Sequence, residues 1–202
     1  MNPLRLVLAS QSPRRAQLLR MLGLTFDTVP AAVDETYYPG EEPGAHARRL
    51  AREKAESIAA VHPAAVVIGS DTVVVVDGEV LGKPIDAGDA VRMLMRLQGR
   101  THVVATGIAV RCDGRTREDV ERVVVRFRSF DAAFAAAYVG TGEPMDKAGA
   151  YGIQGYGAAL VEAIEGDYFA VMGLPIARLI LLLQHAGLHY NFRELTRVEE
   201  RS

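Results

Sequence analysis

The chain has 202 residues, of which 49% are hydrophobic and 24% are charged, and its formal net charge is -2. This length and apolar content are typical of a folded protein with one substantial core or two small lobes, and they exclude a disordered or fibrous chain. The small negative charge lacks the basic excess that usually accompanies binding to nucleic acid or to an anionic membrane. Any phosphate chemistry must therefore depend on a local cluster of cations.

Cysteine content and the apolar runs bear on the cellular compartment. Cys112 is the only cysteine, which excludes an internal disulfide and a zinc site made of thiolates. The apolar runs at residues 4–9 and 179–183 are too short for a secretory signal or a membrane span. We therefore expect a soluble, cytoplasmic protein with neither membrane nor nucleic acid as a partner.

Strand-like and helical patterns alternate along the chain. Apolar runs rich in β-branched residues predict strands at residues 4–9, 66–69, 73–76, 101–110, 120–128 and 160–164. Helical periodicity, in several cases after Pro or Asp at a starting position, predicts helices at residues 13–22, 44–61, 87–97, 132–139 and 175–186. Asp-Gly pairs at 77–78 and 113–114 predict two antiparallel hairpins. The expected fold is α/β, with a mixed, twisted sheet that contains antiparallel hairpins and is flanked by helices.

Residues 10–15 join the first predicted strand to the first predicted helix. They bring the hydroxyls of Ser10 and Ser12 to the same turn as the guanidiniums of Arg14 and Arg15. The free amides at a helix N-terminus favour an anion, and arginine can bind phosphate oxygens in pairs. The alternative is an ordinary helix cap followed by solvated arginines.

A carboxylate at Asp71 interrupts two apolar runs. Burying such a charge is costly unless it is paired, coordinated or protonated. The flanking pattern of residues 69–72 favours a functional site at a strand end, and the alternative is a turn aspartate beside a hydroxyl.

Four further segments carry candidate side chains. Asp34 and Glu35 form an acidic pair in a loop that could hold a hard divalent cation, although such pairs are commonly just solvated. Lys54 and Lys83, each taken alone, fit solvated side chains. Residues 147–157 are rich in glycine, which suits close approach of the backbone to a ligand but also suits a flexible loop.

Taken together in this order, the segments resemble the Maf family of nucleoside triphosphate pyrophosphatases, whose fold is related to that of the inosine triphosphatases. The matching segments are Ser10 to Arg15 with Leu18-Leu19, Arg52 to Ala55, Gly69 to Thr72, Gly82 to Pro84 and Asp146 to Gly155. The resemblance extends from Leu4 to about Leu183. It implies a single domain over residues 1–188, with two lobes around a cleft, then a polar C-terminal tail at residues 189–202, and a homodimer.

The resemblance also implies a chemistry. It indicates a house-cleaning hydrolase that cleaves a nucleotide between the α and β phosphates with a divalent cation, Mg or Mn. Asp71 is at the position of the family's catalytic proton acceptor, and substrate selection falls to Arg14, Thr72 and Gln154. The pair Arg14-Arg15 and the sequence at 152–155 resemble the branch that acts on dTTP and UTP, with CTP and modified pyrimidine nucleotides as further substrates.

Roles for the remaining candidates follow from the charge of a triphosphate. We expect Arg14, Lys54 and Lys83 to neutralise it, and hydroxyls and helix amides to bind its oxygens. The further residues that we assign to substrate binding are Ser10, Ser12 and Arg15. Glu35 and Asp71 are the predicted metal ligands.

Two other classes of function stay open at this point. One is a nucleotide-responsive regulator of septum formation or cell division, which would bind nucleotide without significant turnover. The other is a nucleic-acid-binding protein, which the interspersed charges and low aromatic content disfavour.

Overall fold

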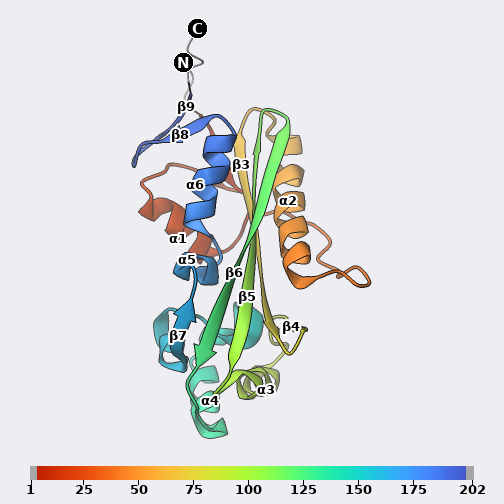
Figure 1. Cartoon of the computed structure of the whole chain (residues 1–202), viewed down its shortest axis with the longest axis vertical. Coiled ribbons are helices and arrows are strands. Elements are labelled where there is room, and N and C mark those ends of the chain that lie inside the picture. The colour runs from red at the N-terminus through yellow and green to blue at the C-terminus, as the bar shows by residue number, and fades with distance from the viewer. Residues whose placement is uncertain (1–3, 199–202) are drawn as a thin grey trace. The chain divides into compact units, whose positions relative to one another are not determined.

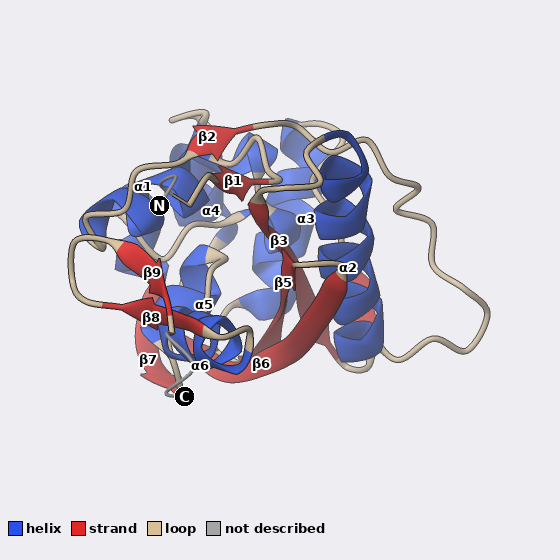
Figure 2. Cartoon of the chain, turned by 90° about the horizontal axis from the view of Figure 1, so that it is seen from above, coloured by secondary structure: helices blue, strands red, loops and turns tan. Residues whose placement is uncertain are grey.

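The computed structural model describes residues 4–198, which fold into a mixed α/β structure (Figure 1 and Figure 2). Its strands are β1 (Leu6–Leu8), β2 (Asp27–Thr28), β3 (Val66–Val76), β4 (Glu79–Leu81), β5 (Thr101–Cys112), β6 (Arg115–Phe127), β7 (Val161–Glu165), β8 (Leu188–Tyr190) and β9 (Leu195–Arg197). Its α-helices are α1 (Pro13–Met21), α2 (Pro43–Val61), α3 (Ala87–Leu97), α4 (Ala132–Val139), α5 (Tyr168–Met172) and α6 (Ile176–His185). Short 3-10 helices are η1 (Glu143–Asp146), η2 (Ala148–Ala150) and η3 (Gly155–Leu160).

Seven of the described strands form one mixed sheet in the order β2-β1-β3-β5-β6-β7, with β4 paired to β3. Strand β1 is parallel to both β2 and β3, whereas β4 is antiparallel to β3 and β7 is antiparallel to β6. The predicted α/β class and mixed sheet are therefore confirmed. Within residues 4–198, no helix combines the length and apolar character needed to cross a membrane.

Turn and cap residues explain the most accurate predictions. Asp77 and Gly78 have φ values of 53° and 78°, so both lie in the left-handed region that a tight hairpin turn requires. Helices α3 and α4 have the predicted bounds because the side chains of Asp86 and Asp131 cap them, accepting hydrogen bonds from backbone amides three residues on.

Strand β3 corrects one prediction. Residues 66–76 form one continuous strand, whereas the sequence predicted two strands with Asp71 at a strand end. The polar side chains are satisfied without a break. Ser70 Oγ lies 2.8 Å from the carbonyl oxygens of both Gly107 and Gly173, and the Asp71 carboxylate contacts Lys54. Asp71 therefore lies within a strand.

The C-terminal segment also has more structure than a polar tail suggests. Strands β8 and β9 pair antiparallel in a separate two-stranded sheet. Leu188 is buried, and the Tyr190 hydroxyl donates a hydrogen bond to the carbonyl of Leu22 at 2.7 Å. The last residues of the predicted tail, 199–202, lie outside the described residues.

The chain divides into two compact units. Unit 1 contains Met1–Asp71, Thr106–Glu121 and Gly173–Ser202, and unit 2 contains Thr72–Ala105 and Arg122–Met172. In unit 1, α2 lies on one face of the strands and α1 and α6 lie on the other (Figure 1 and Figure 2).

Two glycines allow α2 to approach the sheet of unit 1. A Cβ atom on Gly69 would lie 2.1 Å from the carbonyl oxygen of Ala51, and one on Gly107 would lie 2.2 Å from that of Ala47. Small residues of α2, including Ala55, complete the contact. This close packing brings the polar side chains of α2 next to the middle of β3.

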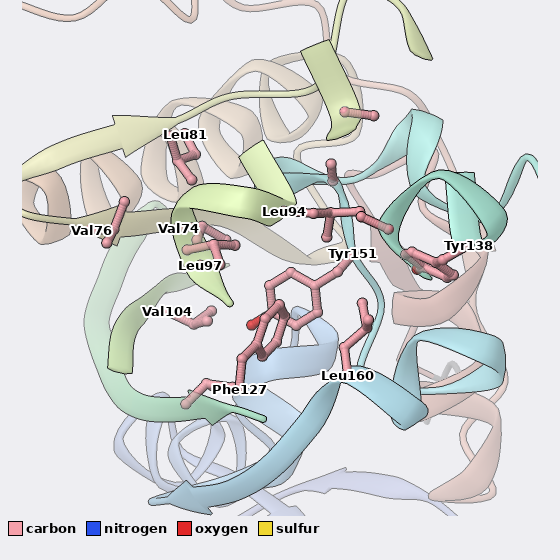
Figure 3. Packing of buried hydrophobic residues seen from close by; sticks show 14 of the residues in the cluster. Val74, Val76, Leu81, Leu94, Leu97, Val104, Phe127, Tyr138, Tyr151 and Leu160 are labelled. Atoms are coloured by element: carbon pink, nitrogen blue, oxygen red, sulfur yellow. The ribbon is translucent and has the colours of Figure 1, made fainter. Parts of the chain in front are cut away.

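Unit 2 has its own core, in which the rings of Phe127 and Tyr151 meet edge to face with centroids 4.7 Å apart (Figure 3). His102 is buried against both rings, and its Nε2 atom lies 2.7 Å from the Tyr151 hydroxyl. The other ring nitrogen, Nδ1, has no hydrogen-bond partner in the part of the chain that the structure describes. Burial lowers the pKa of His102 from 6.5 to about 4.

Because His102 is buried with a lowered pKa, we expect the folded protein to lose stability in mild acid. Because the folded pKa lies below the unfolded one, the unfolded chain binds the extra proton as the pH falls from about 6.5 towards 4. We expect His102 to remove about 2 kcal/mol of unfolding free energy between pH 7 and pH 5. Urea unfolding of His102→Gln at both pH values should show a smaller pH dependence than the wild type. The exposed His185→Gln is the control, and an equal pH dependence in wild type and His102→Gln would contradict the prediction.

Candidate active site

Lys54 of α2 brings together two carboxylates that the sequence singles out. Its Nζ atom lies 2.7 Å from Asp71 Oδ1 and 2.7 Å from Glu35 Oε1. The side chains of Lys54 and Asp71 are only 10% and 13% exposed, whereas that of Glu35 is 60% exposed. The two carboxylates therefore lie within two hydrogen-bond lengths of each other, at the surface of unit 1.

Arg15 is held at the strand-to-helix turn by one contact to the backbone and one to a side chain. Its Nε atom donates to the carbonyl of Gly173 at 2.8 Å, and its Nη1 atom donates to Ser10 Oγ at 3.3 Å. Ser10 Oγ also accepts a hydrogen bond from the amide of Ser12 at 3.1 Å. Pro13 begins α1, and the Ser12 side chain makes no capping hydrogen bond. Ser12 is therefore the helix cap by position only.

The charges around Arg15 form one electrostatic group. Burial lowers the pKa of Arg15, and the neighbouring positive charge of Arg14 lowers it further, while Asp71 and Glu35 act in the opposite direction. With Lys54, this gives three cations for two carboxylates. Guanidinium and ammonium groups are the side chains that bind phosphate oxygens.

The loop that carries Glu35 is fastened to α2 by Arg49. The Arg49 guanidinium donates to both carboxylate oxygens of Glu41, at 2.7 and 2.8 Å, and to the carbonyl of Thr36 at 3.0 Å. It also lies over the ring of Tyr38, 3.9 Å from the centroid. The hydrogen bond from Arg49, together with one from His46, holds the pKa of Glu41 down to about 2. Residue 36 adjoins Glu35, so these contacts restrain the position of that carboxylate.

Replacing Arg49 should therefore destabilise the protein. We expect Arg49→Lys to lower the free energy of unfolding by about 2–4 kcal/mol, because lysine cannot reproduce the paired contacts and leaves Glu41 poorly compensated. Urea unfolding measures the change. The exposed ion pair of Arg92 with Asp89 offers a control, and Arg92→Lys should cost less than about 0.5 kcal/mol. Equal effects of the two variants would contradict this account of the loop.

The remaining predicted site residues belong to unit 2. Thr72 follows Asp71 along β3, Lys83 is exposed after β4, and Gln154 is half-buried immediately before η3. The amide of Gly149 donates to the carbonyl of Gly82 at 3.0 Å. The turn that carries Lys83 therefore lies beside the glycine-rich segment that precedes Gln154. The roles of these residues stay predictions.

Sequence reasoning missed several residues that organise the site. Gly173 supplies the carbonyl that contacts Arg15 and Ser70, although it is 158 residues from Arg15 along the chain. Arg49 has the same residue type and spacing as a solvated helix arginine. Glu143 had only its nearness to the glycine-rich segment as a signal.

The donor set near Lys54 is suited to a hard divalent cation. Glu35 and Asp71 supply carboxylate oxygens, the ligand type that Mg²⁺ and Mn²⁺ prefer. Within residues 4–198, no group of three or more His, Cys, Asp or Glu side chains is placed to bind a metal ion. A cation held by these two carboxylates would take its other ligands from water and phosphate, as Mg²⁺ commonly does.

Comparison with known proteins decides the family. A family model described as "Maf-like protein" matches residues 5–186. The chain belongs to the Maf family. A Maf relative from Moorella thermoacetica, named "dTTP/UTP pyrophosphatase", is 51% identical over 185 residues, which cover 91% of this chain and 95% of the relative.

Two further bacteria carry similar relatives with the same name. The protein from Koribacter versatilis is 48% identical over 182 residues, covering 90% of this chain and 94% of its own length. The protein from Aquifex aeolicus is 45% identical over 185 residues, covering 92% and 97%. The similarity therefore includes nearly the whole of each protein, not an isolated motif.

Proposed function

We propose that this protein hydrolyses dTTP and UTP to the nucleoside monophosphate and pyrophosphate, and so removes these nucleotides from the cellular pool. The observation that carries this proposal is the cluster of Lys54, Asp71 and Glu35 beside the Arg14-Arg15 pair, within a Maf chain. The name shared by relatives at 45–51% identity supports the substrate. CTP and modified pyrimidine nucleotides are further candidate substrates.

In the proposed reaction, water attacks the α phosphorus and the link between the α and β phosphates is cleaved. Asp71 accepts a proton from the water as its oxygen bonds to the α phosphorus, and the bond to the bridging oxygen breaks to release pyrophosphate. Arg14 and Arg15 stabilise the negative charge on the phosphates, and the ion pair with Lys54 holds the Asp71 carboxylate in place. The hydroxyls of Ser10 and Ser12, together with Lys83, complete the proposed phosphate contacts.

A divalent cation, Mg²⁺ or Mn²⁺, is part of the proposal, with Glu35 and Asp71 as its protein ligands. When bound, it would supply a more acidic water and neutralise phosphate charge. The water attacks more readily when the cation shares in its activation with the carboxylate that accepts its proton.

Base selection is proposed for Gln154, with Arg14 and Thr72. The glutamine amide offers one donor and one acceptor, which match the O4 and N3–H groups of uracil and thymine. We expect Gln154→Glu to lower the preference for dTTP over GTP by about tenfold, because the carboxylate keeps an acceptor and loses the donor. The ratio of kcat/KM for the two nucleotides measures this, and an unchanged ratio would rule out the selector role.

The test of the function is pyrophosphate release from dTTP, UTP, CTP, GTP and 7-methyl-GTP, with Mg²⁺ or Mn²⁺ or with EDTA. Multiple turnovers of dTTP and UTP that require the cation are expected. Stoichiometric binding of a nucleotide without turnover would instead support a regulator of septum formation.

Three further properties belong to this proposal. We propose a cytoplasmic location, which the single buried thiol of Cys112 fits. We also propose a homodimer and no binding to nucleic acid. Sedimentation of the pure protein and a mobility-shift assay with oligonucleotides test these two statements.

A further inference from the structure

Two side chains of unit 2 hold the backbone on both sides of Gln154. Before Gln154, the Tyr138 hydroxyl accepts a hydrogen bond from the amide of Gly152 at 3.1 Å. After it, the Glu143 carboxylate accepts from the amides of Tyr156 and Gly157 at 2.8 and 2.9 Å. The Tyr138 hydroxyl donates to Glu143 Oε1 at 2.8 Å, so the two side chains that hold this backbone are also hydrogen-bonded to each other.

The packing around Tyr138 and Glu143 requires glycine at two positions of the segment. Gly155 has φ of 68°, and a Cβ atom there would lie 2.4 Å from Glu143 Oε2. A Cβ atom on Gly157 would lie 2.7 Å from the Tyr138 hydroxyl and 2.1 Å from the carbonyl oxygen of Gly152. The glycine-rich segment is therefore held tightly around a charged acceptor, in contrast to the flexible loop that the sequence alone left open.

Tyr138 and Glu143 are themselves held in place by their surroundings. Tyr138 is 5% exposed at the end of α4 and belongs to the core of unit 2, where Figure 3 shows its ring near Leu94. Burial raises the pKa of the Glu143 carboxyl, but the hydrogen bonds from the amides of Gly157 and Tyr156 and from the Tyr138 hydroxyl, together with the charge of Lys147, bring it below its usual range. Glu143 is therefore an ionised, acceptor-only group at neutral pH.

We propose that Tyr138 and Glu143 are specificity-determining positioning residues, which hold the 152–157 backbone so that the Gln154 amide meets the base in one orientation. This inference rests on the proposed function. A glutamine amide can select a base only if its donor and acceptor reach the base from a defined position, and a fixed backbone holds the Cα atom of Gln154 in one place.

The test combines two variants with two matched controls. Tyr138→Phe removes one hydroxyl and keeps the ring, so the amide of Gly152 loses its acceptor. Glu143→Gln replaces one acceptor oxygen by an NH₂ donor that would face a backbone amide. The controls are Tyr168→Phe, whose hydroxyl has no hydrogen-bond partner within residues 4–198, and the exposed Glu165→Gln.

The main readout is the ratio of dissociation constants for GTP and dTTP, measured by calorimetry in EDTA so that no turnover is needed. We expect the ratio to fall about three- to tenfold in Tyr138→Phe and about tenfold in Glu143→Gln, and to stay unchanged in both controls. Hydrogen exchange of the amides at 152, 156 and 157 should become faster in the two variants, while exchange in β7 should not.

Each outcome bears separately on the two proposals. Faster exchange with an unchanged binding ratio would overturn the positioning role and leave the proposed function standing. Absence of pyrophosphate release by the wild type would overturn the proposed function, while a binding ratio that falls in the variants would still support the positioning role. A wild type with equal affinity for both nucleotides would contradict the positioning role and leave the proposed function to the test of pyrophosphate release.

Discussion

Asp71→Asn is expected to lower kcat for pyrophosphate release from dTTP by about 10²- to 10⁴-fold, the usual contribution of a general base. Asparagine cannot accept the proton from water, and it also lacks the negative charge proposed to help bind the cation. The fold should survive, because the asparagine oxygen can still accept the hydrogen bond from Lys54 that Asp71 Oδ1 accepts at 2.7 Å. Steady-state release of pyrophosphate, with circular dichroism as a check of folding, measures the effect.

The control for this variant is Asp131→Asn. Asp131 caps α4 through a hydrogen bond that asparagine can equally accept, so activity and stability should both remain near those of the wild type. Retention of more than about a third of the wild-type kcat by Asp71→Asn would remove Asp71 from the catalytic step, because one proton acceptor contributes far more than that.

Gly69→Ala is expected to lower the free energy of unfolding by about 3 kcal/mol or more, because overpacking against backbone leaves no side chain that can move aside. The added Cβ atom would lie 2.1 Å from the carbonyl oxygen of Ala51 and 2.8 Å from the amide nitrogen of Ala55. Separation of α2 from β3 would also displace Lys54 from Asp71, so activity should fall together with stability. Urea unfolding and pyrophosphate release on the same preparation measure both effects.

Gly82→Ala is the matched control for this substitution. A Cβ atom on Gly82 would meet nothing within 4 Å, and its φ is not in the left-handed region. Its free energy of unfolding should stay within about 1 kcal/mol of the wild type. A Gly69→Ala variant as stable as Gly82→Ala would show that α2 does not pack on the sheet as described.

The parts of the fold that could be predicted depend on local chemistry. The Asp-Gly turn at 77–78 and the capping aspartates 86 and 131 act on neighbouring residues, so the sequence pattern alone places the hairpin and the bounds of α3 and α4. Strand β3 was predicted as two strands because a polar tetrapeptide normally ends a strand. Only the distant carbonyls of Gly107 and Gly173 and the side chain of Lys54 make the continuous strand possible.

Some residues of the candidate site could likewise be predicted from the sequence, and others could not. The order of motifs singled out Lys54 and Asp71, the acidic loop pair singled out Glu35, and the structure brings the two carboxylates into contact with Lys54. Arg49 and Glu143 were missed because their functions depend on which backbone groups they reach in the folded chain. Their residue types and spacing are indistinguishable from those of solvated charges.

The most direct test of the central claim is the identity of the products formed from dTTP, measured by ³¹P NMR with Mg²⁺ present. Cleavage between the α and β phosphates predicts dTMP and pyrophosphate in equal amounts, with no dTDP at any time. The appearance of dTDP and inorganic phosphate, or of no product from folded protein, would contradict the account.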